Sequence, residues 1–312
     1  MSVVRNYVSL VKFSHTIFAL PFAMIGFTLG VMKPVAEWHG GNPFVPGNPL
    51  PSDDSFFHSY AGTMLIKLLL VLVCMVSARS AAMAFNRYLD RHFDARNPRT
   101  AIREIPAGII SANSALVFTI GCCVVFWVAC YFINTICFYL APVALFVVLF
   151  YSYTKRFTPL CHLVLGLGLS LAPIGAYLAV TGVFHWLPLL FSFAVIFWVS
   201  GFDIIYALQD IDFDRAQQLY SIPAVLGKAK ALRVSELLHL LSTACVVAAG
   251  IYGGFHWLYW AGIAVFTGML LYQHSIVQPD DLRRVNIAFM TANGIASVVF
   301  GILVIGDMFL PY

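Results

Sequence analysis

Asn86-Arg-Tyr-Leu-Asp90-Arg-His-Phe-Asp94 follows directly on an apolar run long enough to cross a membrane, and this junction decides the fold class and the kind of site to expect. Side chains four residues apart on a helix lie on one face, so Asn86, Asp90 and Asp94 form a polar stripe at the helix end. A later apolar run ends in a second acidic set, Asp203, Asp210, Asp212 and Asp214. Ionisable side chains are costly in membrane helices and by default indicate a functional site.

The composition is that of an integral membrane protein. Hydrophobic residues make up 61% of the 312 residues and charged residues only 10%, whereas soluble domains contain about 25% charged residues. The mean hydropathy is +0.86. The seven cysteines lack metal-binding spacing and are interpreted as small buried side chains. The basic residues are not gathered on a polar domain, which argues against nucleic acid as a partner and for the lipid bilayer.

Apolar runs of about 20 residues predict an all-α integral membrane bundle of about nine transmembrane helices, in a single domain over residues 1–312. The first run follows Arg5 and Lys12 without a convincing cleavage site, so we expect an uncleaved span rather than a signal peptide. The runs lie near residues 11–32, 61–85, 111–131, 136–154, 159–181, 186–206, 232–252, 256–273 and 287–308.

The distribution of Lys and Arg predicts how these spans are oriented. With the N-terminus in the cytoplasm, fifteen of the 18 basic residues fall on the cytoplasmic side, all except Lys33, Lys67 and Arg79. This is the pattern of the positive-inside rule. The polar loops near 95–110 and 207–230, which follow the two acidic motifs, are then both cytoplasmic. We expect a multi-pass protein of a bacterial inner membrane, with the mouth of the site on the cytoplasmic face.

Two acidic stripes beside basic loops predict a site for a divalent cation and a charged ligand. Mg²⁺ prefers a few carboxylates together with water and phosphate oxygens. Candidate carboxylates are Asp90, Asp94, Asp210 and Asp214, and candidate cations for a diphosphate are Arg99, Arg103, Lys155 and Arg156. Arg79 shares the face of the first stripe and is expected to point into the bundle, because an intramembrane arginine needs a partner or a wet cavity. An apolar bundle behind such a site suits a prenyl diphosphate.

The two motifs resemble those of the UbiA superfamily of intramembrane prenyltransferases. The family pattern NxxxDxxxD matches Asn86, Asp90 and Asp94. The pattern DxxYAxxDxxxD matches Asp203, Tyr206-Ala207, Asp210 and Asp214. The family's basic segments resemble Tyr151–Arg156 and Arg99–Gly108, and the resemblance covers nearly the whole chain.

The resemblance implies Mg²⁺-dependent transfer of a polyprenyl group from polyprenyl diphosphate to an aromatic acid in quinone biosynthesis. The chain is most similar to 4-hydroxybenzoate polyprenyltransferases; the alternative is a related group that acts on 1,4-dihydroxy-6-naphthoate in menaquinone biosynthesis. Glu104, where many members have Pro, and Tyr220, where 4-hydroxybenzoate enzymes often have Lys, leave the acceptor open.

The resemblance also implies roles for individual residues. Those implied to act in catalysis are Asp90, Asp94, Asp210, Asp214 and Lys155. Those implied to bind substrate are Asn86, Arg99, Arg103, Tyr153, Arg156, Asp203 and Tyr206. Arg79 is added as a substrate-binding candidate on its position alone, because a deep intramembrane cation pairs either with an acceptor carboxylate or with a nearby polar group of the bundle. The implied metal ligands are Asn86, Asp90, Asp94, Asp210 and Asp214.

Other interpretations of these residues remain open. A transporter with an ion site is a different class of function, although transporter sites usually lie near the membrane midplane rather than at helix ends. A non-catalytic quinone-binding or scaffold protein does not account for the paired carboxylates. Asp212 breaks the four-residue register and is interpreted as solvated, with a role as metal ligand as the alternative. His15 and His162 are interpreted as core histidines, with contact to an acceptor as the alternative.

Overall fold

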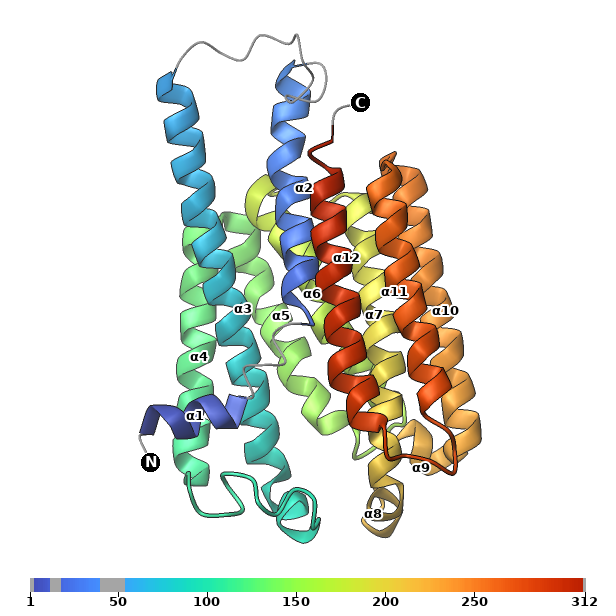
Figure 1. The fold of residues 1–312 in the computed structure, drawn as a ribbon. Coiled ribbons are helices and arrows are strands. Elements are labelled where there is room, and N and C mark those ends of the chain that lie inside the picture. The colour runs from blue at the N-terminus through green and yellow to red at the C-terminus, as the bar shows by residue number, and fades with distance from the viewer. Residues whose placement is uncertain (1–2, 12–17, 40–53, 311–312) are drawn as a thin grey trace.

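The computed structural model describes residues 3–11, 18–39 and 54–310, and these ranges form helices without a β-strand. The long helices run side by side in one bundle, and the short α1 (Val3–Val11) lies across one end of it (Figure 1). The all-α architecture predicted from the apolar runs is confirmed for the described residues.

The described residues contain nine long helices of the bundle. These are α2 (Leu20–His39), α3 (Asp54–Arg96), α4 (Ala112–Ile133), α5 (Thr135–Thr154), α6 (Cys161–Thr181), α7 (Trp186–Ala207), α10 (Lys228–Gly253), α11 (Trp257–Ile276) and α12 (Asn293–Asp307). The short elements are η2 (Leu208–Asp210), α8 (Ile211–Ala216), α9 (Ile222–Leu226) and the π-helical turn η3 (Ile287–Ala292). Local signals set several ends: Ser111 Oγ accepts the amide of Ser114 to cap α4, and Gly182 ends α6 at a φ of 69°.

Seven helical segments within the described ranges are long and apolar enough to cross a membrane. The protein is therefore a multi-pass membrane protein. The first and eighth of the nine expected spans correspond to α2 and α11, which are not among the seven. Among the described residues, the apolar stretch of α2 is Leu20–Met32, and α11 carries Gln273 and His274 near its end. The count of nine spans and their orientation stay predictions.

Helix α7 lies at the centre of the bundle, packed against α6 and α10. Its Trp198 is fully buried among aromatic rings that include Phe22 and Phe266. The indole N–H donates to Asn293 Oδ1 over 2.8 Å, which satisfies the polar atom of this buried ring. Inside a bilayer, van der Waals packing and interhelical hydrogen bonds of this kind hold helices together.

The two acidic motifs lie at the same end of the bundle. The first occupies the last turns of α3, and the second begins on α7 and continues through η2 and α8 (Figure 1). The 3₁₀ turn η2 has fewer residues per turn than an α-helix, so it shifts the register after Ala207. The second acidic set is therefore spread over the end of α7, η2 and α8 and does not lie along one helical stripe.

Candidate active site

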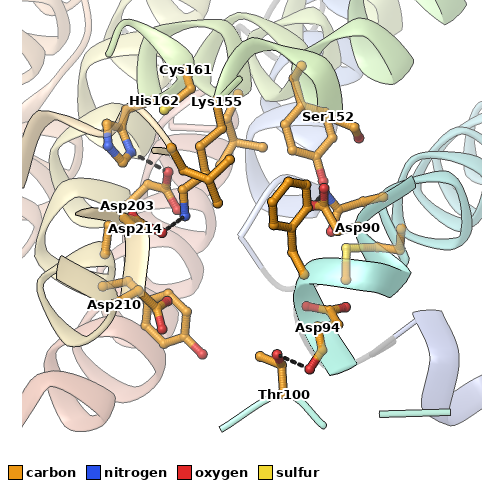
Figure 2. A pocket seen from close by; sticks show the side chains of 18 of the residues that line it. Asp90, Asp94, Thr100, Ser152, Lys155, Cys161, His162, Asp203, Asp210 and Asp214 are labelled. Carbon is orange, nitrogen blue, oxygen red and sulfur yellow. Dashed lines mark hydrogen bonds and ion pairs between the residues drawn. The ribbon is translucent and has the colours of Figure 1, made fainter. Parts of the chain in front are cut away.

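The end of the bundle that carries both motifs contains a cavity of about 300 Å³. One wall is the end of α3, with Asp90 and Asp94. The opposite wall is formed by α7, η2 and α8, with Asp203, Asp210 and Asp214 (Figure 2). Two acidic sets that are far apart in the sequence thus face one cavity, which is hereafter called the charged cavity.

Each carboxylate of the α3 wall is paired with an arginine from another segment. Asp90 accepts a hydrogen bond from Asn86 Nδ2 at 3.0 Å, and its Oδ1 lies 2.7 Å from Nη2 of Arg156. Oδ1 of Asp94 lies 2.6 Å from Nη1 of Arg103. Ionised carboxylates that are partly or fully removed from water require such partners.

The opposite wall repeats this pairing with different cations. Nζ of Lys155 lies 2.7 Å from Oδ1 of Asp214, and Ser221 Oγ donates to the second oxygen of that carboxylate over 2.8 Å. Arg99 forms an ion pair with Asp210. Four acidic side chains of the charged cavity therefore each have a permanent cation beside them.

Residues of the loop after α3 join the two walls. Arg99 Nη1 donates to Tyr206 Oη over 2.9 Å, and Asn97 Nδ2 donates to Asp210 Oδ1 over 3.2 Å. Burial by itself lowers the pKa of Arg99, but the hydrogen bonds and charge of Asp210 outweigh it, and the pKa of Arg99 is raised. Burial likewise lowers the pKa of Lys155, whereas the ion pair with Asp214 raises it to above the usual value. Both side chains therefore remain charged at neutral pH.

The donor atoms of the charged cavity fit Mg²⁺. The carboxylates offer only oxygen, and Asp94 Oδ2 is buried without a hydrogen-bond partner, with Arg87 Nη1 at 4.0 Å. A buried acceptor of this kind is one that a bound cation satisfies. Within the described ranges, no three His, Cys, Asp or Glu side chains form a group that could hold a metal alone. Mg²⁺ does not need one, because it completes its shell with water and phosphate oxygens.

Most residues singled out from the sequence line the charged cavity. They are Arg79, Asn86, Asp90, Asp94, Arg99, Arg103, Lys155, Arg156, Asp203, Tyr206, Asp210 and Asp214. Tyr153 does not: it is exposed, and its ring packs on Arg156 with Cζ 5.4 Å from the ring centroid. Tyr151, two residues earlier on α5, faces the cavity instead, because successive helical residues turn by about 100°. The geometry thus gives no support to the substrate contact expected of Tyr153.

The charged cavity also contains residues that motif analysis does not single out. Arg87 lies seven residues before Asp94, two helical turns away on one face, and this spacing could have indicated it. His162 is buried, as a core histidine is, yet it lines the cavity with Nδ1 2.6 Å from Oδ2 of Asp203. No sequence signal links His162 on α6 with Asp203 on α7. His15 lies outside the described residues.

A second cavity of about 390 Å³ adjoins the charged one, and its lining is mainly apolar. Side chains of α3, α4, α5 and α6 surround it, among them Met75, Val148 and Leu171. The residues that line both cavities are Arg79, Met83, Tyr151, Leu165 and Leu169. The shared lining makes the apolar cavity a continuation of the charged one into the bundle.

A multi-pass helical bundle with a charged cavity at one end and an apolar extension behind it has the form of an enzyme that acts on amphipathic lipids. Residues 55–295 match the sequence model of the UbiA prenyltransferase family. This range is most of the chain, so the chain belongs to the UbiA prenyltransferase family and is a prenyl-transferring enzyme.

Relatives of known name and structure agree with this assignment. A protein named 4-hydroxybenzoate octaprenyltransferase from Nitrosospira multiformis is 29% identical over 76% of this chain and 82% of that protein. One of the same name from Burkholderia lata is 30% identical, over 71% and 77%. The apo structure of a UbiA homolog from Aeropyrum pernix K1 is 30% identical with a TM-score of 0.77, covering 94% of this chain and 98% of that one. A UbiA homolog from Archaeoglobus fulgidus bound to GPP and Mg²⁺ is 18% identical with a TM-score of 0.68, over 98% and 100%, and shares the fold.

Proposed function

We propose that this enzyme transfers a polyprenyl group from a polyprenyl diphosphate to a small aromatic acid in quinone biosynthesis, with Mg²⁺ as cofactor and 4-hydroxybenzoate as the favoured acceptor. The observation that carries the proposal is the pair of connected cavities. The charged cavity offers carboxylates and cations for a metal and a diphosphate, and the apolar cavity offers room for a hydrocarbon chain.

The diphosphate end of the substrate is assigned to the charged cavity. Asp90, Asp94, Asp210 and Asp214 are the proposed metal ligands, and Asn86 holds Asp90 through a 3.0 Å hydrogen bond. Bound Mg²⁺ would neutralise the diphosphate and stabilise the charge that develops on the leaving pyrophosphate. The cations now paired with these carboxylates are placed to donate charged hydrogen bonds to phosphate oxygens. They are Arg99, Arg103, Lys155 and Arg156.

The prenyl chain is assigned to the apolar cavity. Its lining passes into that of the charged cavity around Met83, Leu165 and Leu169, so the reactive end of the chain would lie at this junction. Departure of pyrophosphate from an allylic carbon leaves a cation that water would quench. Apolar walls around the junction exclude water and leave the aromatic ring as the nucleophile.

The acceptor is assigned to the part of the charged cavity next to the junction. Arg79 lines both cavities, and its Nε is buried without a hydrogen-bond partner in the described part of the chain. A carboxylate on the acceptor would satisfy this group. Phe202 and Phe289, with ring centroids 5.5 Å apart, line the same cavity and offer apolar faces to an aromatic ring.

The names of the relatives favour 4-hydroxybenzoate over 1,4-dihydroxy-6-naphthoate as the acceptor. The two departures from the family pattern, Glu104 and Tyr220, do not argue against 4-hydroxybenzoate, because of where their side chains lie. Glu104 accepts a hydrogen bond from Ser9 Oγ at 2.5 Å, and the Tyr220 amide donates to Lys155 O over 2.7 Å. Neither of these two side chains is among those that line the charged cavity.

The proposed setting is a bacterial inner membrane with the mouth of the charged cavity on the cytoplasmic side. The support is the apolar helices, the bacterial relatives and the basic residues that gather at the end of the bundle where the motif loops lie. The diphosphate head group of the lipid and the water-soluble aromatic acid would then meet the site at the cytoplasmic face, while the prenyl chain stays in the bilayer or the apolar cavity.

Incubation of the purified protein in detergent or nanodiscs with a labelled prenyl diphosphate and a panel of aromatic acids tests the proposal. We expect a prenylated acid and released pyrophosphate, loss of both with EDTA, and recovery with Mg²⁺. The panel contains both acceptors and benzoate, which lacks the ring hydroxyl, as a control. Pyrophosphate release without any prenylated acid would contradict the proposal, and so would ion transport into proteoliposomes in place of turnover.

A further inference from the structure

Asp203 differs from the other aspartates of the charged cavity in its partner. Four of the five pair with Arg or Lys. Oδ2 of Asp203 instead lies 2.6 Å from Nδ1 of His162, and its other oxygen has no hydrogen-bond partner in the described part of the chain. The Asp203 side chain is 23% exposed, and Figure 2 shows it on the wall opposite Asp90. One carboxylate oxygen is thus available to a molecule in the cavity.

His162 is held so that it donates to Asp203. The backbone N–H of Ile222 points at Nε2 over 3.4 Å. A backbone N–H can only donate, so Nε2 is the accepting nitrogen, and the ring proton of the neutral imidazole is assigned to Nδ1, the nitrogen that faces Asp203. Neutral imidazole supports the carboxylate by a hydrogen bond and leaves its negative charge in place, whereas an arginine or lysine would neutralise it.

The backbone that carries this pair is fixed by close packing of α6 against α7. Ser200 Oγ, one turn before Asp203, donates to the carbonyl oxygen of His162 over 3.1 Å. Gly166 allows the close approach, because a Cβ there would lie 2.5 Å from Ile196 O. The His162 ring is 3% exposed and enclosed on the protein side. The direction of the Asp203 carboxylate is therefore set by the fold before any ligand arrives.

The surroundings of Asp203 suit an aromatic acceptor more than a phosphate. Phe202 and Phe289 line the cavity beside it. Arg79 lines the same cavity and is the proposed partner of the acceptor carboxylate. A negatively charged oxygen repels phosphate but accepts a hydrogen bond from a hydroxyl group.

We infer that His162 is a positioning residue for the acceptor, which holds Asp203 so that its second oxygen accepts a hydrogen bond from the ring hydroxyl of the aromatic acid. This inference rests on the proposed function. The hydrogen bond draws the hydroxyl hydrogen toward Asp203 and increases electron density on the ring carbons that attack the prenyl group. It also selects acceptors that carry a hydroxyl, because an acceptor without one would cover the carboxylate oxygen and leave it without a donor.

The variants His162→Leu and His162→Asn test the inference. Leu removes the donor, whereas Asn places an N–H at the δ position, as Nδ1 of histidine is placed. In His162→Leu, kcat/KM for the acceptor should fall by about 10- to 100-fold, as for loss of a hydrogen bond to a charged group, while the diphosphate KM changes by less than about twofold. His162→Asn should recover a large part of the loss. Equal changes in both KM values, or no difference between Leu and Asn, would overturn the inference.

A double-mutant cycle with Asp203→Asn separates positioning from a merely structural role. If His162 acts through Asp203, His162→Leu should have little further effect in the Asp203→Asn background. Additive losses would contradict this. Should the Leu variant fail to fold, the wild type still decides: it should use 4-hydroxybenzoate far better than 4-methoxybenzoate, and equal use would overturn the inference. Wild-type protein that prenylates no aromatic acid would refute the proposed function itself, a result distinct from these.

Discussion

At the residue scale, the charged cavity holds its carboxylates in ion pairs that a metal and a diphosphate can replace. We expect Asp90→Asn, Asp94→Asn, Asp210→Asn and Asp214→Asn each to lower turnover by at least about 100-fold, the scale for loss of a charge-stabilising catalytic group. Pyrophosphate release from a labelled substrate measures this. Asp212→Asn is the matched control, because Asp212 is exposed and does not line the cavity. Wild-type turnover in any two of the four variants would refute the metal assignment.

Lys155 is expected to keep its charge over the whole working range of pH. Its pKa is raised above 10.5 in spite of burial, because Asp214 lies 2.7 Å away. A group whose pKa is raised by folding stabilises the fold below its unfolded pKa and loses this effect only as pH rises through the folded value. The melting-temperature difference between wild type and Lys155→Met should therefore be constant from about pH 6 to 9 and shrink only above about pH 10. A difference that disappears near about pH 8 would contradict the ion pair.

Arg79 is expected to serve the acceptor and not the diphosphate. Arg79→Met removes the cation at the junction of the two cavities, so the KM for 4-hydroxybenzoate should rise more than the diphosphate KM. Phenol, which lacks the carboxylate, should be a poor acceptor for the wild type. Lys67→Met is the control: Lys67 is also on α3, but its Nζ donates to Val180 O over 3.0 Å and it lines neither cavity. Equal turnover with phenol and 4-hydroxybenzoate would show that the carboxylate of the acceptor does not contribute to its binding.

At the element scale, contact between α6 and α7 sets the shape of the charged cavity. Gly166→Ala would place a methyl group 2.5 Å from Ile196 O and 2.6 Å from Ser200 Oγ. Backbone cannot yield as a flexible side chain does, so we expect a loss of about 1–3 kcal/mol in stability, as in other overpacked cores. Thermal unfolding in detergent measures it, together with a fall in activity. Gly175→Ala on the same helix meets no atom within 4 Å and should melt no lower than wild type, because Ala favours a helix interior over Gly. Equal melting of all three proteins would contradict this packing argument.

Helices could be predicted from apolar runs, but their ends could not always be. The run 186–206 agrees with α7, which ends at Ala207. The run 61–85 is much shorter than α3, which extends from Asp54 to Arg96, because polar residues end the membrane-spanning part of a helix without ending the helix. The turn η2 has no spacing signal in the sequence and follows from tertiary packing.

The same division applies to the candidate site. Asp90 and Asp94 could be predicted because helical spacing places them on one face. The link between His162 and Asp203, and that between Asn97 and Asp210, could not, because each joins side chains whose separation is set by how whole helices pack. The spacing in the sequence shows which residues share one face of a helix. The distance between side chains on two different helices depends on how those helices pack in the fold.

At the scale of the whole molecule, α1 and the loop after α3 close one side of the end that carries the site. Leu10 of α1 is buried in a cluster with Ala84 of α3 and Ile110 of the following loop. Figure 1 shows α1 lying across the bundle at that end. Helices that lie flat in this way are typical of the membrane–water interface. The interface of the bilayer is therefore expected to pass close to the mouth of the charged cavity.

The side of the membrane on which this mouth lies is the last prediction. Most of the basic residues gather on the side of the motif loops, so both loops should be cytoplasmic. Nη1 of Arg96 donates to Gln217 Oε1 over 3.1 Å, which joins the two loops across the mouth and requires them to share one side. In a cysteine-free variant, single cysteines at Ala95 and Gln217 should react with an impermeant thiol reagent only in inside-out vesicles. A cysteine at Val183, in the loop at the other end of α6, is the control and should react only from outside. Labelling of Ala95 or Gln217 from outside would reverse the orientation, and labelling of the two from opposite sides would separate the two acidic walls.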